Sequence, residues 1–491
     1  MYLRLYLKNI TMKNATLPIR LMAVLFVFTG LIISCAINPV TGKKEFMLVS
    51  ENQEKAMGLA YDPQVIAEFG LYDDQKLQNF INEKGKKMGR LSHRPQLDYQ
   101  FRILDSPVVN AFAVPGGYVY FTRGIMAHFN NEAEFAGVLG HEIGHITARH
   151  SARQQSDAIL AQVGFMAAMI ASKDFRKYSD LAQTGLALLF LKFSRNHESQ
   201  SDKLGVEYST KIGYDSHEMA NFFQTIGRIQ EQSGGGIPTF LSTHPDPGQR
   251  YSKVHELSTK EQQKTGKTNL SVNRDDYLRM IDGLIYGEDP RQGYVENNVF
   301  YHPEMRFQFP TPQGWQTINS ASKVQIAPKD GKAVILLTLS NEKSLDAAAQ
   351  AAIAQDSLRV IDKRNVNVNG NTAIEITADL NPQVRLLMYL IQYNGLIYKF
   401  AGLAETPNFN TYQPAFLNCF KNFKALTDQS KINVKAERIK IQTATKDSSL
   451  AETLNQFNIP ASRHEELAIL NGMQLKDQVK KGTLIKVVEK K

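Results

Sequence analysis

Residues 138–150, VLGHEIGHITARH, contain two histidines four positions apart, with a glutamate directly after the first. On a helix, His145 lies about 40° and Glu142 about 100° around the axis from His141, so the three side chains share one side. A His-Glu-x-x-His motif supplies two imidazole ligands for zinc and a carboxylate that can take a proton from water. The motif therefore predicts a helix that carries part of a zinc site, with a third ligand from elsewhere in the chain.

A third ligand is expected from the segment FSRNHESQSD, residues 193–202. Glu198 and Asp202 are one helical turn apart, and Arg195 precedes Glu198 by three positions. We assign Glu198 as the third zinc ligand and Asp202 as the outer acceptor that holds a ligating histidine in one tautomer. Arg195 would neutralise excess carboxylate charge. His197 is a rival ligand, but on a helix it projects about 100° away from Glu198.

The helix that carries the motif has a recognisable start and several glycines. Asn131 is a good N-cap, and Glu134 three residues later completes the pattern of a capping box. Gly137, Gly140 and Gly144 lie beside the expected ligands, although each glycine costs a helix about 1 kcal/mol. Close approach of another backbone would explain them, because only glycine leaves that space open.

The first 35 residues combine a basic lead, an apolar run and a cysteine. The run Leu21–Ile33 is too short to span a bilayer comfortably. Ile32-Ile33-Ser34-Cys35 resembles a bacterial lipobox, in which the cysteine is lipidated and becomes the mature N-terminus. We therefore expect residues 1–34 to be a signal peptide and Cys35 to carry the lipid. The expected location is periplasmic, at the outer membrane because Ala36 is not aspartate. An uncleaved anchor is the alternative.

The rest of the chain has the composition of a globular protein. Its 491 residues, 43% of them apolar, suffice for about three domains. The formal net charge of +9 falls to +5 without the first 34 residues, and no dense basic cluster stands out. Nucleic-acid binding is therefore not expected. With Cys35 lipidated, Cys419 has no disulfide partner and is expected to be a buried thiol.

The order of the expected elements indicates a multidomain α+β protein. Residues 35–290 are predicted to form a mainly helical domain with a small antiparallel sheet, which has strands at 101–104 and 118–122. A helix expected at 157–172 is either a buried core helix or a flap that faces the membrane or covers the substrate. A second long helix is expected from about Ser179 to Gly213.

Residues 298–427 are predicted to form an antiparallel α+β domain. Short strands precede an alanine-rich helix at 345–356. Two hairpins are expected at Asn369-Gly370 and Asn394-Gly395, because these dipeptides favour tight primed turns. A helix at 411–425 closes the domain.

Residues 437–491 are predicted to follow the order strand, helix, helix, strand. This βααβ order resembles the LysM peptidoglycan-binding module over Leu450–Phe457, Leu467–Asn471 and Gly482–Val487. The usual Gly-Asp-Thr opening is here KDSS, so the match is partial. The resemblance implies either peptidoglycan binding or a degenerate module that contacts protein, and both alternatives stay open.

Several spaced motifs recur in one order within residues 36–290. They are NPVTG (38–42), NAFAVPGG (110–117), HEIGH (141–145), Glu198 with Asp202, GYD (213–215) and STHPDPGQR (242–250). This order resembles the zinc metalloendopeptidase family of the CAAX prenyl proteases, the stress-induced bacterial membrane proteases and the periplasmic β-barrel assembly-enhancing protease. The resemblance implies a gluzincin-type fold, with His141, His145 and Glu198 as ligands of one zinc ion and Glu142 as the catalytic base.

The same resemblance gives roles to two later residues. His244 and Arg250 match the family's His-Pro…Arg element, which approaches the zinc. His244 could polarise the substrate, steady the oxyanion or sit on the metal as a fourth ligand in a resting state. His150 and His217 are expected at the surface or in an outer layer, and the remaining histidines show no ligand spacing.

The resemblance implies a lipid-anchored endopeptidase that removes unfolded or misassembled envelope proteins. Substrate is expected to add as a strand along Asn110, Ala111, Phe112 and Ala113. The other expected partners are the membrane, through Cys35, and peptidoglycan, through 437–491. The alternative is a cell-wall-binding or chaperone-like lipoprotein with a structural or closed zinc site. An integral membrane protease is disfavoured, because no apolar run reaches about 18 residues after the signal.

Overall fold

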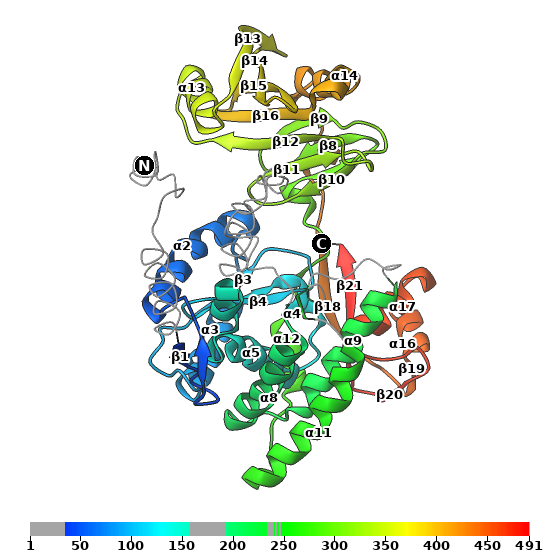
Figure 1. The fold of residues 1–491 in the computed structure, drawn as a ribbon. Helices are drawn as coiled ribbons and strands as arrows, with labels where there is room; N and C mark the ends of the chain where they lie inside the picture. Colours follow the sequence, from blue (N-terminus) through cyan, green and yellow to red (C-terminus); the bar gives the residue numbers. More distant parts are fainter. Residues whose placement is uncertain (1–34, 158–192, 233–239, 241–242, 245–246, 491) are drawn as a thin grey trace, which may run out of the picture.

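The computed structural model describes residues 35–157, 193–232, 240, 243–244 and 247–490. They form a mixed α+β protein in which a mainly helical lower part lies beneath a sheet-rich upper part (Figure 1). The expected α+β class is confirmed. Residues 1–34, and all but the first residue of the helix expected at 157–172, lie outside the described residues.

Helix α5 (Glu132–Thr147) carries the His-Glu-x-x-His motif and is buried along its whole length. Asn131 caps it as predicted, because its side-chain oxygen accepts a hydrogen bond from the backbone N–H of Glu134. The reciprocal half of the predicted capping box is displaced by one residue, since the Glu134 carboxylate accepts from the N–H of Asn130. Two side chains thus accept hydrogen bonds from backbone N–H groups at the start of the helix.

Helix α8 (Arg195–Lys211) packs closely against α5. A Cβ atom on Gly140 would lie 2.9 Å from the carbonyl oxygen of Gly205, and one on Gly144 would lie 3.2 Å from the Cα of Ser201. A side chain at Gly140 would therefore force the two helices apart. The prediction that the glycines admit another backbone is confirmed for Gly140 and Gly144, whereas the space beside Gly137 is filled first by the side chain of Met219 in the following helix α9 (His217–Gln232).

The helix expected from Ser179 to Gly213 begins at Arg195 instead. Ser194 has extended backbone angles, and its hydroxyl accepts from the N–H of His197, so it is the N-cap of α8. The part of the expected helix before Phe193 lies outside the described residues. The prediction missed this boundary because Ser194 interrupts a pattern that otherwise continues to the end of the helix.

A three-stranded sheet lies beside α5. It consists of β3 (Gln100–Leu104), β5 (Tyr118–Thr122) and β4 (Ala111–Val114), in that order. β3 runs parallel to β5, and only β4 and β5 are antiparallel, so the expected wholly antiparallel sheet is wrong. The tight connection at 115–117 pairs β4 with β5 and leaves β4 at the edge among the described strands.

Further elements complete the lower part (Figure 1). They are β1 (Cys35–Ile37), β2 (Lys44–Phe46), α2 (Glu51–Phe69), α3 (Gln75–Arg90), α4 (Arg123–His128), α9 (His217–Gln232), α11 (Pro247–Thr265), α12 (Arg274–Met280) and β6 (Ile285–Tyr286). Among the described helices, none is both long enough and apolar enough to cross a membrane.

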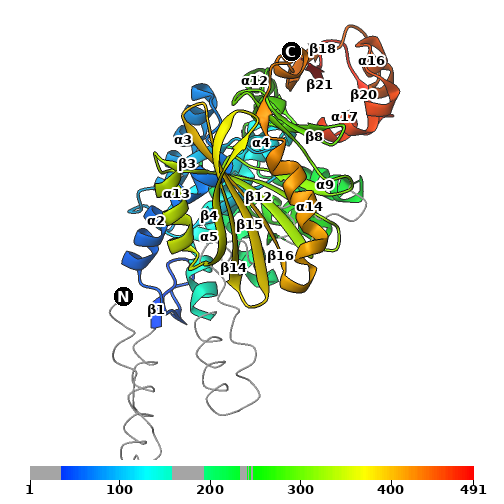
Figure 2. The same ribbon diagram turned by 90° about the horizontal axis from the view of Figure 1, so that it is seen from above.

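The upper part is built on a seven-stranded antiparallel sheet. In spatial order its strands are β10 (Gln316–Asn319), β11 (Val324–Ala327), β12 (Ala333–Ser340), β16 (Leu396–Glu405), β15 (Val384–Tyr393), β14 (Asn371–Asn381) and β13 (Arg359–Val368). Helices α13 (Leu345–Gln355) and α14 (Phe409–Lys421) cover opposite faces (Figure 2). Leu386 of β15 shares a core with α13, whereas its neighbour Leu387 shares a separate core with α14.

The two predicted hairpins of this part are confirmed. Asn369 and Asn394 adopt left-handed backbone angles at the β13–β14 and β15–β16 turns. The helix expected at 411–425 is wrong at its end, because the chain leaves α14 after Lys421 and forms β17 (Lys424–Ala425). β17 pairs with β9 (Phe307–Pro310) in a second sheet, which also contains β8 (Val299–His302) and β7 (Tyr294–Glu296).

The C-terminal residues follow the predicted order of strand, helix, helix and strand. The elements are β18 (Glu437–Thr443), α16 (Leu450–Gln456), α17 (His464–Leu470) and β21 (Leu484–Lys490), with the short strands β19 (Ser448–Ser449) and β20 (Gln478–Val479). β18 pairs with β21 and, through its first residues, with β6 of the lower part. One hydrophobic core contains Leu467 and Leu470 of this unit together with Phe222 of α9. The C-terminal unit is therefore built into the helical part.

Lys486 of β21 joins the C-terminal unit to the lower part from inside the protein. Its ammonium group is buried and donates to the carbonyl oxygens of Ala127 and Phe129, at 2.8 and 2.9 Å. Burial lowers the pKa of Lys486 to about 7. Both carbonyl groups lie just before Asn131, the cap of α5. The C-terminal unit thus helps to hold the start of the helix that bears the motif.

We expect Leu470→Ala, in the C-terminal unit, to lower the free energy of unfolding of the helical part by about 2–5 kcal/mol, because the two share one core. Thermal unfolding monitored by loss of metal binding would report this change. Leu387→Ala is a matched control, since Leu387 is equally buried but belongs to the separate core under α14. If Leu470→Ala left the unfolding of the metal site unchanged, the shared core would not couple the two units.

Candidate metal centre

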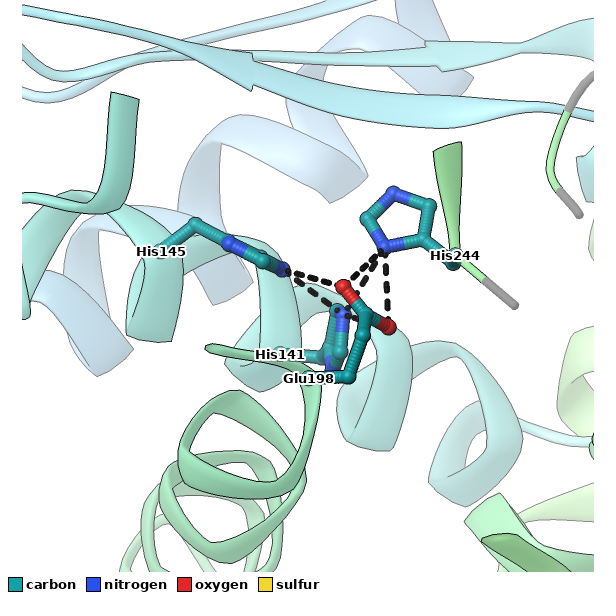
Figure 3. Close-up of side chains that lie close together, drawn as sticks. All are labelled: His141, His145, Glu198 and His244. Carbon is teal, nitrogen blue, oxygen red and sulfur yellow. Dashed lines mark hydrogen bonds and ion pairs between the residues drawn. The ribbon is translucent and has the colours of Figure 1, made fainter. Parts of the chain in front are cut away.

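Four ionisable side chains converge between α5, α8 and the segment before α11 (Figure 3). His141 and His145 come from α5, Glu198 comes from α8, and His244 lies three residues before α11. One ligand atom from each lies within 4.8 Å of the other three, and all four residues are buried. Buried polar groups of this kind require partners, and three imidazoles with one carboxylate suit a metal ion.

The spacing of the ligand atoms suits tetrahedral coordination. His145 Nε2 lies 3.0 Å from His141 Nε2 and 3.4 Å from Glu198 Oε1. His244 Nδ1 lies 3.0 Å from the same carboxylate oxygen. Donor atoms bonded to one tetrahedral zinc ion at about 2.0–2.1 Å are separated by about 3.3 Å. The four side chains therefore fit a zinc ion without large movement.

The outer contacts of the histidines leave lone pairs facing inward. His141 Nδ1 lies 3.0 Å from a carboxylate oxygen of Asp202, which can only accept, so this nitrogen carries the hydrogen. The Nε2 lone pair of His141 then points at His145 and Glu198. Burial lowers the pKa of His145 well below its usual value, which keeps this imidazole neutral and able to bind a metal. Neutral imidazoles with lone pairs that face one another can therefore bind a cation.

Arg250 holds the two carboxylates of α8. Its guanidinium donates to Asp202 at 2.6 Å and lies 3.1 Å from Glu198. Burial disfavours both carboxylate charges, but the positive charge of Arg250 keeps the pKa of Asp202 below its usual value. Burial likewise opposes ionisation of Glu198, and the charges of His244 and Arg250 hold its pKa well below the usual range. These are the contacts that we expected of Arg195, which begins α8 and borders a cavity of about 270 Å³ beside Glu198.

Glu142 lies next to the four side chains without being one of them. Its carboxylate is buried, and its Oε1 lies 3.6 Å from His244 Nε2, which is too far for a hydrogen bond. Among the described residues, neither of these two atoms has a hydrogen-bond partner. Burial raises the pKa of Glu142, which makes its carboxylate a stronger proton acceptor than an exposed glutamate. This arrangement suits a general base.

The rival ligand His197 lies outside the group of four. Its ring stacks on His150 with 4.3 Å between ring centroids. His150 is buried directly behind His145, and the Nδ1 atoms of the two rings are 3.0 Å apart. The sequence analysis expected His150 at the surface or in an outer layer, and its buried place behind His145 corresponds to the second of these. His217 instead contacts Asp215, with Nδ1 2.7 Å from its carboxylate.

The expected substrate strand coincides with β4 and the residue before it. Asn110, Ala111, Phe112 and Ala113 are all buried. Asn110 accepts from the N–H of Thr122 in β5, so the backbone groups of Ala111 and Ala113 point away from β5. No other described strand pairs with that edge. Figure 3 shows strands of the sheet passing beside the four side chains.

We expect Asp202→Ala to weaken zinc binding by about 10–100-fold, because it removes the acceptor that orients His141. Asp202→Asn keeps one acceptor oxygen for His141 but loses the charge and one of the two acceptors for Arg250, so it should weaken zinc binding less than Asp202→Ala. Competition with a chromogenic chelator measures the affinity, after thermal unfolding has shown that each variant is folded. An Asp202→Ala protein that binds zinc as tightly as the unmodified one would contradict the role of Asp202.

Comparison with known proteins agrees with the geometry. Residues 75–258 match the family model described as Peptidase family M48. The β-barrel assembly-enhancing protease of Yersinia pestis is 28% identical over 324 residues, which cover 62% of this chain and 61% of that protein. The mitochondrial metalloendopeptidase OMA1 of Arabidopsis thaliana is 32% identical over 183 residues, 37% of this chain and 36% of that protein.

A third relative, the β-barrel assembly-enhancing protease of Escherichia coli K12, is 28% identical over 220 residues, 43% of this chain and 45% of that protein. The chain thus spans less than two thirds of the length of each of these relatives. The family match contains His141, His145, Glu198 and His244. It ends before the sheet-rich upper part and the C-terminal unit.

Proposed function

We propose that this protein is a zinc-dependent endopeptidase of the bacterial cell envelope, and the match of residues 75–258 to the model of peptidase family M48 supports the proposal. The observation that carries the proposal is the buried group of His141, His145, Glu198 and His244 with Glu142 beside it. We propose unfolded or misassembled envelope proteins as its substrates. The two relatives named β-barrel assembly-enhancing protease support a role in the envelope.

His141, His145 and Glu198 would hold one zinc ion, in the gluzincin manner. When bound, zinc lowers the pKa of water and stabilises negative charge on a carbonyl oxygen. The Glu142 carboxylate takes the proton of the attacking water and later delivers it to the departing amine nitrogen. Arg250 and Asp202 keep Glu198 ionised and His141 correctly oriented.

His244 is proposed to close the site in a resting state. Its Nδ1 lies 3.0 Å from Glu198 and 3.2 Å from His141, the position of a fourth ligand. Burial opposes a charge on His244, but Glu198 and Glu142 raise its pKa. Since four protein donors leave no place for water, His244 must move before hydrolysis, and in its moved position it can assist the oxyanion.

The edge of β4 is proposed to bind substrate. The backbone groups of Ala111 and Ala113 that point away from β5 can pair with an extended peptide. Binding of this kind depends on main-chain groups, so selectivity would follow from whether a segment is unfolded. Folded proteins, whose backbone groups are already paired, would be poor substrates.

Two further parts of the proposal concern attachment. The lipobox-like sequence before Cys35 supports a lipid anchor at the outer membrane, facing the periplasm. For residues 437–491, their pairing with β6 and the contacts of Lys486 favour protein contact over peptidoglycan binding. Radioactive palmitate labelling of the unmodified protein and of Cys35→Ala tests the lipid anchor. Sedimentation with purified peptidoglycan tests whether residues 437–491 bind peptidoglycan.

The rival function is a chaperone-like or cell-wall lipoprotein whose zinc site stays closed. The observation that favours it is the place of His244 among the four donors. We expect the purified protein to cleave unfolded casein, to lose that activity with a chelator and to regain it with added zinc. A protein that contains zinc but cleaves neither casein nor denatured envelope extract would instead support the closed-site function.

A further inference from the structure

Behind the proposed ligand His145 lies a second imidazole that does not reach the metal site. His150 is 1% exposed, and its Nδ1 lies 3.0 Å from Nδ1 of His145. Its Nε2 lies 2.9 Å from the side-chain oxygen of Gln200 on α8. A row of three side chains thus runs from the outer face of α8 through His150 to the metal site.

The position of His150 requires a strained backbone conformation at the residue before it. Residues five apart on a continuous helix point about 140° away from each other, so His150 could not contact His145 if α5 continued. The chain instead turns at Arg149, which has a φ of 59°, in the left-handed region that costs a non-glycine residue about 1–2 kcal/mol. Buried contacts hold Arg149 in this conformation, since its guanidinium donates to Glu54 and to the carbonyl oxygen of Val49, both at 2.8 Å.

Valence determines the hydrogens along this row. If Nε2 of His145 carries the metal, its Nδ1 must carry the hydrogen, because a neutral imidazole has only one N–H. His150 Nδ1 must then accept this hydrogen bond, so its own hydrogen lies on Nε2. The oxygen of Gln200 is placed to accept from that Nε2–H. No charged group is needed at any step.

We propose that His150 is a positioning residue of the metal centre, a neutral imidazole that accepts the Nδ1–H of His145 while Gln200 keeps it in the Nε2-protonated tautomer. The inference rests on the proposed zinc site and adds to it. It implies that the two histidine ligands differ in the charge of the group that accepts their Nδ1–H. His141 donates to the ionised Asp202, which Arg250 also binds, whereas His145 donates to a neutral acceptor.

Ring packing supports the same role. Phe193 stacks on His145 with 4.1 Å between centroids, and His197 stacks on His150 at 4.3 Å. The two rings of the row therefore have little rotational freedom, and their nitrogen atoms stay aligned. Orientation of this kind is what outer partners supply to metal-binding histidines.

The test compares three variants of the full-length protein by zinc affinity, with the metal alone and no substrate. His150→Leu removes the acceptor but keeps a similar volume, so zinc binding should weaken by about 10–100-fold. His150→Asn places an amide oxygen near the position of Nδ1, so affinity should stay within about threefold of the unmodified protein. Gln200→Leu removes the acceptor that fixes the tautomer of His150 but leaves His145 and His150 in place. Its zinc affinity should therefore lie between those of His150→Leu and His150→Asn.

The tautomer itself can be read in the unmodified protein. Long-range ¹H–¹⁵N spectra of zinc-loaded, ¹⁵N-histidine-labelled protein should show His150 with hydrogen on Nε2 only and His145 with hydrogen on Nδ1. This measurement needs no variant, so it decides the proposal even if His150→Leu does not fold.

Three results would overturn the proposal. They are a His150 hydrogen on Nδ1, equal zinc affinity in folded His150→Leu, or a folded His150→Asn protein as weak as His150→Leu. In each case zinc binding and casein cleavage by the unmodified protein would leave the proposed function intact. An unmodified protein that binds no zinc would overturn both.

Discussion

The Glu142→Gln protein is expected to bind zinc as tightly as the unmodified protein and to cleave unfolded casein about 10²–10⁴-fold more slowly. The amide has nearly the shape of the carboxylate, so the buried site should keep its packing. It cannot accept a proton from water, and burial is what raises the pKa of the native Glu142 carboxyl toward a useful range. The expected loss therefore comes from chemistry, with metal binding unchanged.

Initial rates on labelled casein, together with zinc content after gel filtration, check this result. Glu207→Gln is a matched control, because Glu207 is on α8 and pairs with Lys211 at the surface, away from the four donors. We expect that control to cleave at the unmodified rate. Purified Glu142→Gln that cleaves casein at an undiminished rate would show that Glu142 is not the base.

What the sequence predicted well was local. The His-Glu-x-x-His spacing, the Asn131 cap and the two Asn-Gly hairpins each depend on residues within a few positions of one another. The close approach of another backbone to Gly140 and Gly144 was also predictable, since glycine costs a helix stability and is expected where a neighbouring backbone needs the space. Each of these signals depends on a spacing that the fold must preserve.

What the sequence could not predict depends on contacts between distant segments. β3 runs parallel to β5 because β4 turns back on β5, and no periodicity in the strands records that order. The docking of the C-terminal unit includes hydrogen bonds from Lys486 to carbonyl groups more than 350 positions earlier in the chain. His150 reaches His145 only because Arg149 leaves the helical conformation, and the contacts of Arg149 with Glu54 that permit this are also distant in sequence.

The metal ligands could be predicted from the sequence only in part. The sequence favours Glu198 because Arg195 and Asp202 lie about one helical turn before and after it. The structure places Glu198 beside both histidines. The arginine that contacts it proved to be Arg250, from a segment 52 positions later. The helix face was therefore predictable from spacing, whereas the identity of its partner was not.

Glu198→Ala is expected to weaken zinc binding by about 10²–10³-fold, because an apparent zinc-binding free energy of about 10–16 kcal/mol is shared among four donors. Glu198 is the only anion among them, so its loss also removes the charge that balances the metal. Casein cleavage should fall below detection at micromolar zinc. Arg250 keeps its hydrogen bonds to Asp202, so the α8–α11 contact should survive and the variant should fold.

Comparison with His197→Ala separates ligand loss from disturbance of α8. His197 precedes Glu198 by one residue, but its ring stacks on His150 outside the donor group. It should therefore retain most of the zinc affinity, whereas Glu198→Ala should lose it. Equilibrium dialysis against buffered zinc measures both. If Glu198→Ala kept full zinc occupancy while His197→Ala lost it, the third ligand would be His197, and the hydrolytic arrangement proposed for Glu142 would have to be abandoned.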